Sequence, residues 1–270
     1  MRKVVTLTTD FGLSDPFVGI MKGVMLSIDP EIDFIDMTHD LPPQDIAAGA
    51  ISLRSIENSF PPGTVHLAVV DPGVGTDRNP IIARTDRYYY VGPDNGIFTL
   101  IEPEILEVVR ISNEKLIAKR PSATFHGRDI FAPAAARLFS TEMKEFGERL
   151  EGITKLDFPA VETGAGAIEG EIIYIDRFGN LFTNIRDEML EEAFKGCKAD
   201  DLEITIGGRT IKGLCRAYAF GGRGELSAIV NSFGYVEIFT RNGNAALLSN
   251  FAKGEKVSVS LAKQKGSSGE

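Results

Sequence analysis

The sequence predicts an N-terminal α/β domain with a mostly parallel sheet, followed by a C-terminal small β-barrel or β-sandwich domain. In the first half, short β-rich segments alternate with longer segments of helical periodicity, which is typical of α/β proteins. Beyond the small-residue segment 163–167, short strands joined by turns predominate. We therefore expect one domain at residues 1–160 and a second at residues 168–262.

The N-terminal half contains three expected helices and five expected strands. Residues 17–28 carry apolar side chains at helical spacing, and Pro30 ends this helix because proline lacks an amide hydrogen. Asp129 is expected to cap the last helix, with Pro133 in its first turn. The expected helices are residues 17–28, 45–56 and 130–139, and the expected strands are residues 4–8, 33–37, 65–70, 81–85 and 88–91.

The C-terminal half contains seven expected strands and one helix. Gly207 and Gly208 predict a two-residue hairpin turn between two of the strands. The polar tail at residues 263–270 contains glycine and serine, and we expect it to be disordered. The expected strands are residues 171–175, 181–185, 203–206, 210–214, 228–230, 235–239 and 256–261, and the expected helix is 186–194.

Composition excludes several classes of protein. The chain has 270 residues, of which 43% are hydrophobic, and a formal net charge of −9. This charge argues against a general nucleic-acid or anionic-membrane binder, since both need clustered Lys and Arg. The two cysteines, Cys197 and Cys215, are too few for a disulfide scaffold, and no Cys/His spacing suggests a zinc site. The apolar run at residues 4–9 is too short for a signal peptide or a membrane span, so we expect a cytoplasmic protein.

Five polar clusters are the most informative feature, because each lies where a short apolar strand ends. Loops at strand ends often carry function on a rigid scaffold. The clusters therefore predict a ligand cleft assembled from distant segments, and a small-molecule enzyme. They are residues 8–12, 71–75, 124–129, 176–180 and 231–234.

Each cluster taken alone also fits a structural role. Asp10 could bind the hydroxyls of a ribose or could cap a turn, and Asp71 lies in a sequence typical of a turn. Of the three histidines, His126 alone lies in a Gly-Arg-Asp loop before a helix. His66 falls within an apolar strand and is expected to pack in the core, whereas the role of His39 stays open.

Taken together and in order, the clusters resemble the S-adenosyl-L-methionine (SAM) hydroxide adenosyltransferases, which are relatives of the fluorinase and chlorinase. The resemblance runs from about residue 4 to residue 261. It implies hydrolysis of SAM to adenosine and methionine without a metal or cofactor. It also implies a homotrimer whose site lies between the N-terminal domain of one subunit and the C-terminal domain of its neighbour. The strongest motifs are residues 9–12, 71–76 with Arg78, 93–96, 125–129 and 176–180.

The resemblance assigns the chemistry to Asp71, Arg78 and His126. Methionine leaves the sulfonium as a neutral thioether, so attack at C5′ needs a well-placed nucleophile and no general acid. Arg78 and His126 would orient water or hydroxide, with Asp71 holding both, and the positive charge would stabilise hydroxide. His126 could instead act as a general base. The sequence leaves both roles open.

The resemblance also implies the substrate contacts. Asp10 corresponds to the aspartate that binds the ribose, and Asp15 to a second acid on the same loop. Asn180 corresponds to an amide that contacts adenine. Asp176 and Ser232 correspond to positions that hold the methionine ammonium and carboxylate.

Two other functions stay open at this point. One is a 5′-halogenase that uses chloride or fluoride, and the other is a SAM or adenosine sensor without catalytic activity. The fluorinase carries a serine where this chain has Gly127, and an arginine after the serine of its methionine site where this chain has Phe233. The resemblance therefore does not carry over halide binding or the details of carboxylate binding. A 5′-halonucleoside product would indicate the halogenase, and adenosine binding without methionine release would indicate the sensor.

Overall fold

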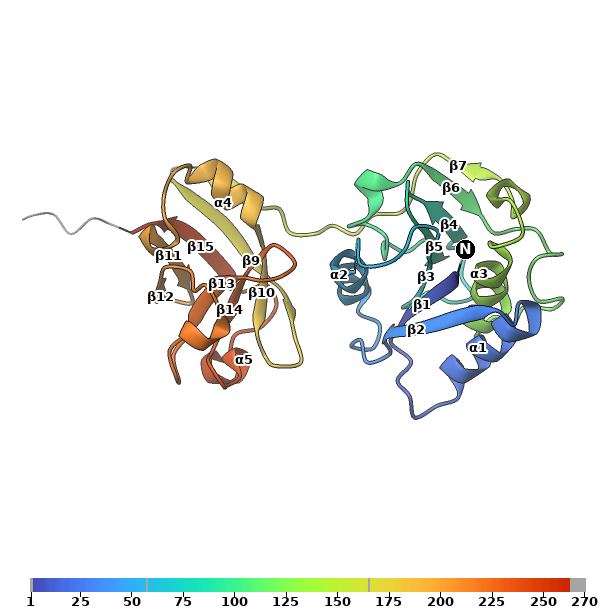
Figure 1. Ribbon diagram of the computed structural model, residues 1–270, viewed down its shortest axis with the longest axis horizontal. Coiled ribbons are helices and arrows are strands. Elements are labelled where there is room, and N and C mark those ends of the chain that lie inside the picture. Colours follow the sequence, from blue (N-terminus) through green and yellow to red (C-terminus); the bar gives the residue numbers. More distant parts are fainter. Residues whose placement is uncertain (1, 57, 165, 263–270) are drawn as a thin grey trace, which may run out of the picture. The chain divides into compact units, whose positions relative to one another are not determined.

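The computed structural model describes residues 2–56, 58–164 and 166–262, so the predicted disordered tail lies outside the described residues. The chain divides into two compact units, Met1–Asp157 and Phe158–Glu270 (Figure 1). Each unit has its own hydrophobic core. The predicted α/β class with a β-rich C-terminal part is confirmed. The domain limits at residues 160 and 168 stay a prediction, since compactness alone does not establish independent folding.

A seven-stranded sheet forms the centre of the N-terminal unit. Its strands are β1 Lys3–Thr9, β2 Ile32–Thr38, β3 Val65–Val69, β4 Pro80–Arg84, β5 Tyr89–Pro93, β6 Glu107–Arg110 and β7 Arg149–Leu150. The spatial order is β2-β1-β3-β5-β4-β6-β7. The first four strands in this order pair in parallel, and the last three extend the sheet in antiparallel fashion. The change follows from the predicted β4–β5 hairpin, because a tight turn reverses the chain direction.

Helices cover both faces of this sheet. They are α1 Phe17–Ile28, α2 Ile46–Ser55 and α3 Ala132–Arg137. In Figure 1, α1 and α3 lie on one face and α2 lies on the other. Met21 and Met25 of α1 pack with Phe131 in the core beneath the first pair. The helix α1 has the bounds that its apolar spacing predicts. No helix within the described part of the chain is long and apolar enough to cross a membrane.

The segment before α3 differs from the prediction. A single π-helical turn, Gly127–Phe131, precedes α3, and Asp129 lies inside this turn. The prediction that Asp129 caps a helix from residue 130 to 139 is therefore wrong. Its carboxylate points back along the chain, accepting a hydrogen bond from the backbone N–H of Ser122 (2.7 Å) and two from Arg128. Pro133 does lie in the first turn of α3.

The C-terminal unit is an antiparallel sheet that nearly closes into a barrel. Its strands are β8 Glu162–Gly164, β9 Ala167–Ile175, β10 Leu181–Arg186, β11 Leu202–Ile206, β12 Arg209–Lys212, β13 Ser227–Val230, β14 Tyr235–Phe239 and β15 Lys256–Leu261. The order is β12-β11-β15-β9-β10-β14-β13, and β8 pairs with β9. A bridge from Cys215 to Ile229 of β13 brings the chain just after β12 against the opposite edge.

Two short helices, α4 Asp187–Ala193 and α5 Ala245–Ser249, lie at opposite ends of this sheet in Figure 1. The sequence predicted α4 but not α5. The helix α5 is only five residues long, and Asn244 caps it by accepting a hydrogen bond from the N–H of Leu247 (2.8 Å). The predicted hairpin turn is present, since Gly207 and Gly208 both have positive φ and join β11 to β12.

Candidate functional site

Asp10 and Asp71 leave the same edge of the N-terminal sheet. The strands β1 and β3 are parallel, with Thr9 opposite Val69, so the residues that follow them emerge side by side. The Oδ2 atom of Asp10 accepts a hydrogen bond from the backbone N–H of Gln44 (2.8 Å). Asp15 lies exposed in the loop before α1.

Asp71, Arg78 and His126 form one hydrogen-bonded chain. Arg78 donates from Nε to Oδ1 of Asp71 (2.9 Å) and from Nη2 to Oδ2. The same Nη2 donates to Nδ1 of His126 (2.7 Å). The side chains of Asp71 and Arg78 are only 5% and 8% exposed, and the guanidinium lies over the ring of Phe131. A bidentate buried pair of this kind fixes the arginine in one orientation.

The guanidinium also has a donor that is not used. The Nη1 atom of Arg78 is buried and has no hydrogen-bond partner within the described residues. Since a buried donor without a partner is costly, such an atom often marks a place where a ligand or water binds. Arg78 is therefore anchored through two of its nitrogens and open at the third.

The contact with Arg78 decides the protonation of His126. A guanidinium can only donate, so Nδ1 accepts, and the neutral imidazole carries its hydrogen on Nε2. Burial lowers the pKa of His126, and the positive charge of Arg78 lowers it further, against the opposing effect of Asp71 and Asp129. His126 is thus a neutral ring with an N–H donor at Nε2 near pH 7.

Aromatic packing joins the loop of His126 to the loop of Asp10. The ring of Phe125 packs edge-to-face against Phe11 (centroids 6.1 Å apart) and Phe17 (5.3 Å). The guanidinium of Arg128 lies over the ring of Phe125 and also forms an ion pair with Asp129. The two polar clusters are therefore held together by apolar neighbours.

Gly75 lets the Asp71–Arg78 segment approach the His126 loop. It has φ of +79°, and a Cβ atom there would collide with the backbone carbonyl of Ala123. Only glycine combines this conformation with this contact. The backbone spacing between the two loops, and with it the reach of Arg78 to His126, depends on this residue.

The motif at residues 93–96 supports the end of β3. Asn95 donates from Nδ2 to the carbonyl oxygen of Val70 (2.8 Å), which directly precedes Asp71. Its Oδ1 accepts from the N–H of Ile97 (3.3 Å). This motif therefore positions the end of β3 from which Asp71 extends.

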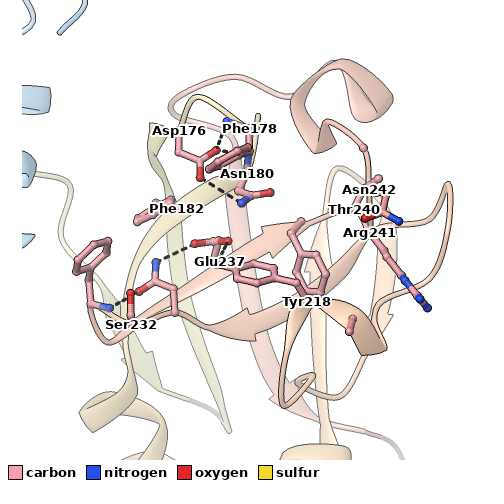
Figure 2. Close-up of a pocket in the computed structure, with 15 residues that line it drawn as sticks. Asp176, Phe178, Asn180, Phe182, Tyr218, Ser232, Glu237, Thr240, Arg241 and Asn242 are labelled. Carbon is pink, nitrogen blue, oxygen red and sulfur yellow. Dashed lines mark hydrogen bonds between the residues drawn. The ribbon is translucent and has the colours of Figure 1, made fainter. Parts of the chain in front are cut away.

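A cavity of about 620 Å³ lies on the C-terminal unit (Figure 2). Its lining includes Asp176, Asn180, Tyr218, Ser232, Glu237 and Arg241. Asp176 accepts hydrogen bonds from the backbone N–H of Asn180 (2.8 Å) and from its side-chain amide (3.1 Å). The three residues predicted in this half, Asp176, Asn180 and Ser232, thus line one cavity.

Glu237 and Tyr218 are lining residues that our sequence analysis did not identify. Glu237 lies on β14 and is 1% exposed, and its Oε1 accepts from the hydroxyl of Tyr218 (2.9 Å). Burial raises the pKa of Glu237 above its usual range. The pKa of Tyr218 is also raised, mainly by burial and in addition by its hydrogen bond to Glu237. The available signal was an acid at the centre of the apolar strand 235–239.

The other two histidines are structural. His66 is fully buried among aromatic rings, as predicted, and burial lowers its pKa to about 3. His39 is also buried, with Nδ1 2.8 Å from Oγ1 of Thr9 and Nε2 3.1 Å from Asp36. It supports the end of β1 just before Asp10. Within residues 2–56, 58–164 and 166–262, no group of three or more His, Cys, Asp or Glu residues could hold a metal ion.

An Asp–Arg–His chain at a sheet edge and a polar, aromatic cavity on a β-barrel define a small-molecule enzyme of the α/β class. Models of the SAM hydroxide adenosyltransferase N-terminal and C-terminal domains match residues 5–147 and 170–258. The chain belongs to the SAM hydroxide adenosyltransferase family.

Individual relatives agree with this placement. A protein of Methanocaldococcus jannaschii named (R)-S-adenosyl-L-methionine hydrolase is 36% identical over 259 residues, covering 92% of each chain. A fluorinase of an Actinoplanes species is 28% identical over 292 residues, covering 96% of this chain and 98% of its own. The crystal structure of an uncharacterized conserved protein from Thermotoga maritima superposes with a TM-score of 0.88 at 33% identity, covering 95% of this chain and 99% of that one.

Proposed function

We propose that the chain hydrolyses SAM to adenosine and L-methionine, and that it acts on the (R) configuration at sulfur. The family and the hydrolases at 36% identity support hydrolysis over halogenation, since the fluorinase is more distant. The (R) configuration rests on the names of those relatives. The observation that carries the mechanism is the contact between Arg78 and His126.

The reaction replaces the C5′–S bond of SAM with a C5′–O bond. The oxygen of water attacks C5′ as the C5′–S bond breaks, and the electron pair of that bond stays on sulfur as the methionine thioether. One proton of the water is released, so cationic SAM and water give adenosine, methionine and a proton. Because the leaving group is neutral, the site does not need to protonate it.

We assign the binding of the nucleophile to two N–H donors of the Asp–Arg–His chain that have no partner within this hydrogen-bonded chain. The Nη1 atom of Arg78 and the Nε2–H group of His126 would both donate to the oxygen of hydroxide, whose third lone pair remains free to attack C5′. Two donors and the charge of Arg78 stabilise a negative oxygen. His126 would therefore orient the nucleophile, because its one lone pair accepts from Arg78 and is not available to a proton of the nucleophile. Asp71 holds Arg78 in place.

The proposed substrate contacts follow the family correspondence. Asp10 would bind the ribose hydroxyls, with Asp15 contributing from the same loop. Asn180 would contact adenine, and Asp176 and Ser232 would hold the methionine ammonium and carboxylate. The shared cavity of the last three residues supports this assignment.

We also propose a homotrimer in which each site combines the N-terminal unit of one subunit with the C-terminal unit of its neighbour. The division of the proposed contacts supports this arrangement, since Asp10 belongs to one compact unit and Asn180 to the other. Co-expressed Arg78→Ala and Asn180→Ala subunits should then regain activity in mixed oligomers, and light scattering should give three subunits. A monomer with full activity would exclude the arrangement. The cytoplasmic location stays a prediction.

The first test of the function uses ¹⁸O-labelled water. Purified protein is incubated with separated (R) and (S) epimers of SAM, and adenosine and methionine are followed by mass spectrometry. Label in the adenosine 5′-hydroxyl, formed faster from the (R) epimer, is the expected result. Unchanged substrate in a protein that binds adenosine would identify a sensor, and a chloride-dependent 5′-chloro product would identify a halogenase.

A further inference from the structure

Three segments of the C-terminal unit meet at the buried side chain of Glu237. The Oε1 atom accepts from Tyr218 (2.9 Å), and the Oε2 atom accepts from Nδ2 of Asn231 (3.0 Å). Figure 2 shows Glu237 at the centre of the cavity lining, between Ser232 and Tyr218. Both carboxylate oxygens are therefore occupied by groups from opposite sides of the cavity.

A carboxylate in this position is unfavourable for folding alone. Every residue of β14 is buried, and the other four, Tyr235, Val236, Ile238 and Phe239, are apolar or aromatic. Desolvation penalises an acid there, which the raised pKa of Glu237 reflects. An apolar residue would pack in such a strand without that desolvation cost. The contacts of Glu237, and not stability, therefore account for an acid at this position.

The contact with Asn231 determines the turn that presents Ser232. Because Nδ2 of Asn231 donates to Glu237, the amide is oriented with Oδ1 in the opposite direction. That oxygen accepts from the backbone N–H groups of Phe233 (2.9 Å) and Tyr235 (3.1 Å). These two bonds close the turn between β13 and β14, and Ser232 lies exposed at its tip. Glu237 thereby fixes the geometry of a residue that it does not touch.

The contact with Tyr218 holds the opposite side of the cavity. The Tyr218 ring packs edge-to-face on Phe239 with centroids 5.0 Å apart, while 46% of the residue remains exposed. A hydroxyl anchored at the base and an open ring suit an aromatic platform for a ligand. The carboxylate of Glu237 keeps this ring at a constant distance from the Ser232 turn.

We propose that Glu237 is a positioning residue for substrate binding, which sets the Ser232 turn and the Tyr218 ring in one geometry across the cavity. The identity of the ligand rests on the proposed function. Since Asp71, Arg78 and His126 belong to the other compact unit, loss of Glu237 should weaken binding and leave the chemical step intact.

The test compares Glu237→Met with Glu237→Gln. Methionine has similar volume but removes both acceptors, whereas glutamine can accept from one partner and donate to the other. We expect Glu237→Met to raise KM for SAM and Kd for adenosine at least tenfold with kcat within threefold, and Glu237→Gln to raise KM about threefold. Glu171→Met is the matched control, because Glu171 is a largely buried strand glutamate paired with Lys256 away from the cavity.

Amide hydrogen exchange provides a readout that needs no substrate. The N–H groups of Phe233 and Tyr235 should exchange at least tenfold faster in Glu237→Met, and less than threefold faster in Glu237→Gln and Glu171→Met. Tyr218→Phe removes only the other contact, so it should raise KM about threefold and leave this exchange unchanged. It also keeps the test open if Glu237→Met does not fold, since an unchanged KM in Tyr218→Phe contradicts the inference.

The outcomes separate this inference from the proposed function. If KM and exchange in Glu237→Met match those in Glu171→Met, Glu237 has no positioning role even though hydrolysis stands. A fall in kcat without a change in KM or exchange would also overturn the inference, because it places Glu237 in the chemical step. If the wild type binds adenosine but does not hydrolyse SAM, the proposed function fails, and exchange and adenosine Kd still decide the role of Glu237.

Discussion

The Nη2 atom of Arg78 donates to Nδ1 of His126 across 2.7 Å, so this histidine presents an N–H group, and not a lone pair, at its other nitrogen. The sequence allowed two roles for His126, a general base and a residue that orients water. The contact favours the second, because protonation at Nδ1 would require the bond from Arg78 to break.

Substitution of His126 distinguishes the two roles. Glutamine can place an amide N–H close to the position of Nε2, whereas alanine cannot. We expect His126→Ala to lower kcat about 100-fold, because one of the two donors that hold the hydroxide is lost, and His126→Gln to lower it only about tenfold. Equal losses in the two variants would favour the general base. Single-turnover rates in quenched reactions provide the measurement.

The pH dependence of kcat gives a second, independent test. The neutral ring of His126 is the active form, and burial and the charge of Arg78 lower its pKa below 6.5. Protonation of His126 should therefore leave the rate unchanged as the pH falls from 8 through 6.5, and should lower it only below that value. An inflection at or above pH 6.5 that His126→Gln abolishes would contradict this assignment.

Asp10 and Arg78 should affect different kinetic constants. Arg78→Lys keeps a positive charge but loses the bidentate contact with Asp71 and the bond to His126, so kcat should fall at least about 100-fold with adenosine Kd within about threefold. Asp10→Ala should instead raise adenosine Kd at least about tenfold, since a carboxylate can accept from both ribose hydroxyls. Asp40→Ala, an exposed acid, is the control. Calorimetry and initial rates measure the two constants, and the same pattern in both variants would contradict the separation.

The buried His66 should make the N-terminal unit sensitive to acid. Its folded pKa of about 3 lies below the unfolded value of 6.5, so the unfolded chain binds the proton first and stability is lost as the pH falls from 6.5 towards 3. Between pH 6.5 and 5 this loss amounts to about 2 kcal/mol. His66→Phe should remove it in urea titrations at the two pH values, while Thr6→Val, which removes only the partner of Nδ1, should retain it. Unchanged pH dependence in His66→Phe would show that another group is responsible.

Gly127→Ser should not create a halide site. A Cβ atom at Gly127 would lie 3.1 Å from Sδ of Met21 and 3.2 Å from the ring of Phe125, so a side chain there presses on the loop that carries His126. We expect destabilisation of about 1–3 kcal/mol, slower hydrolysis, and no 5′-halonucleoside in chloride or fluoride. Gly127→Ala controls for the added Cβ. A halogenated product from Gly127→Ser would show that the loop can adapt.

Local patterns in the sequence predicted the elements that depend on local interactions. The helix α1 and the strand β14 have the bounds that their periodicity indicates, because apolar spacing and neighbouring turns define both. The π-helical turn at Asp129 was not predictable, since it depends on a contact with Ser122 that only the folded loop provides. The helix α5 was missed because five residues show little periodicity.

The same distinction applies to the candidate site. The motifs gave Asp71, Arg78 and His126 as a set, and the structure brings them into contact, but the direction of the hydrogen bond that determines the tautomer is a property of the fold. Glu237 was overlooked because it lies within an expected strand, outside the five polar clusters. Its function depends on Tyr218, which lies 19 residues earlier in the chain.

The collision that a Cβ atom at Gly75 would make with Ala123 limits how this protein can evolve. Asp77, two residues later, is exposed and can vary without moving the backbone. Any codon change that replaces Gly75 would separate the loops of Arg78 and His126 and remove activity in a single step. Selection for hydrolysis in a library randomised at positions 75 and 77 should therefore return glycine at the first position and a broad spectrum of residues at the second.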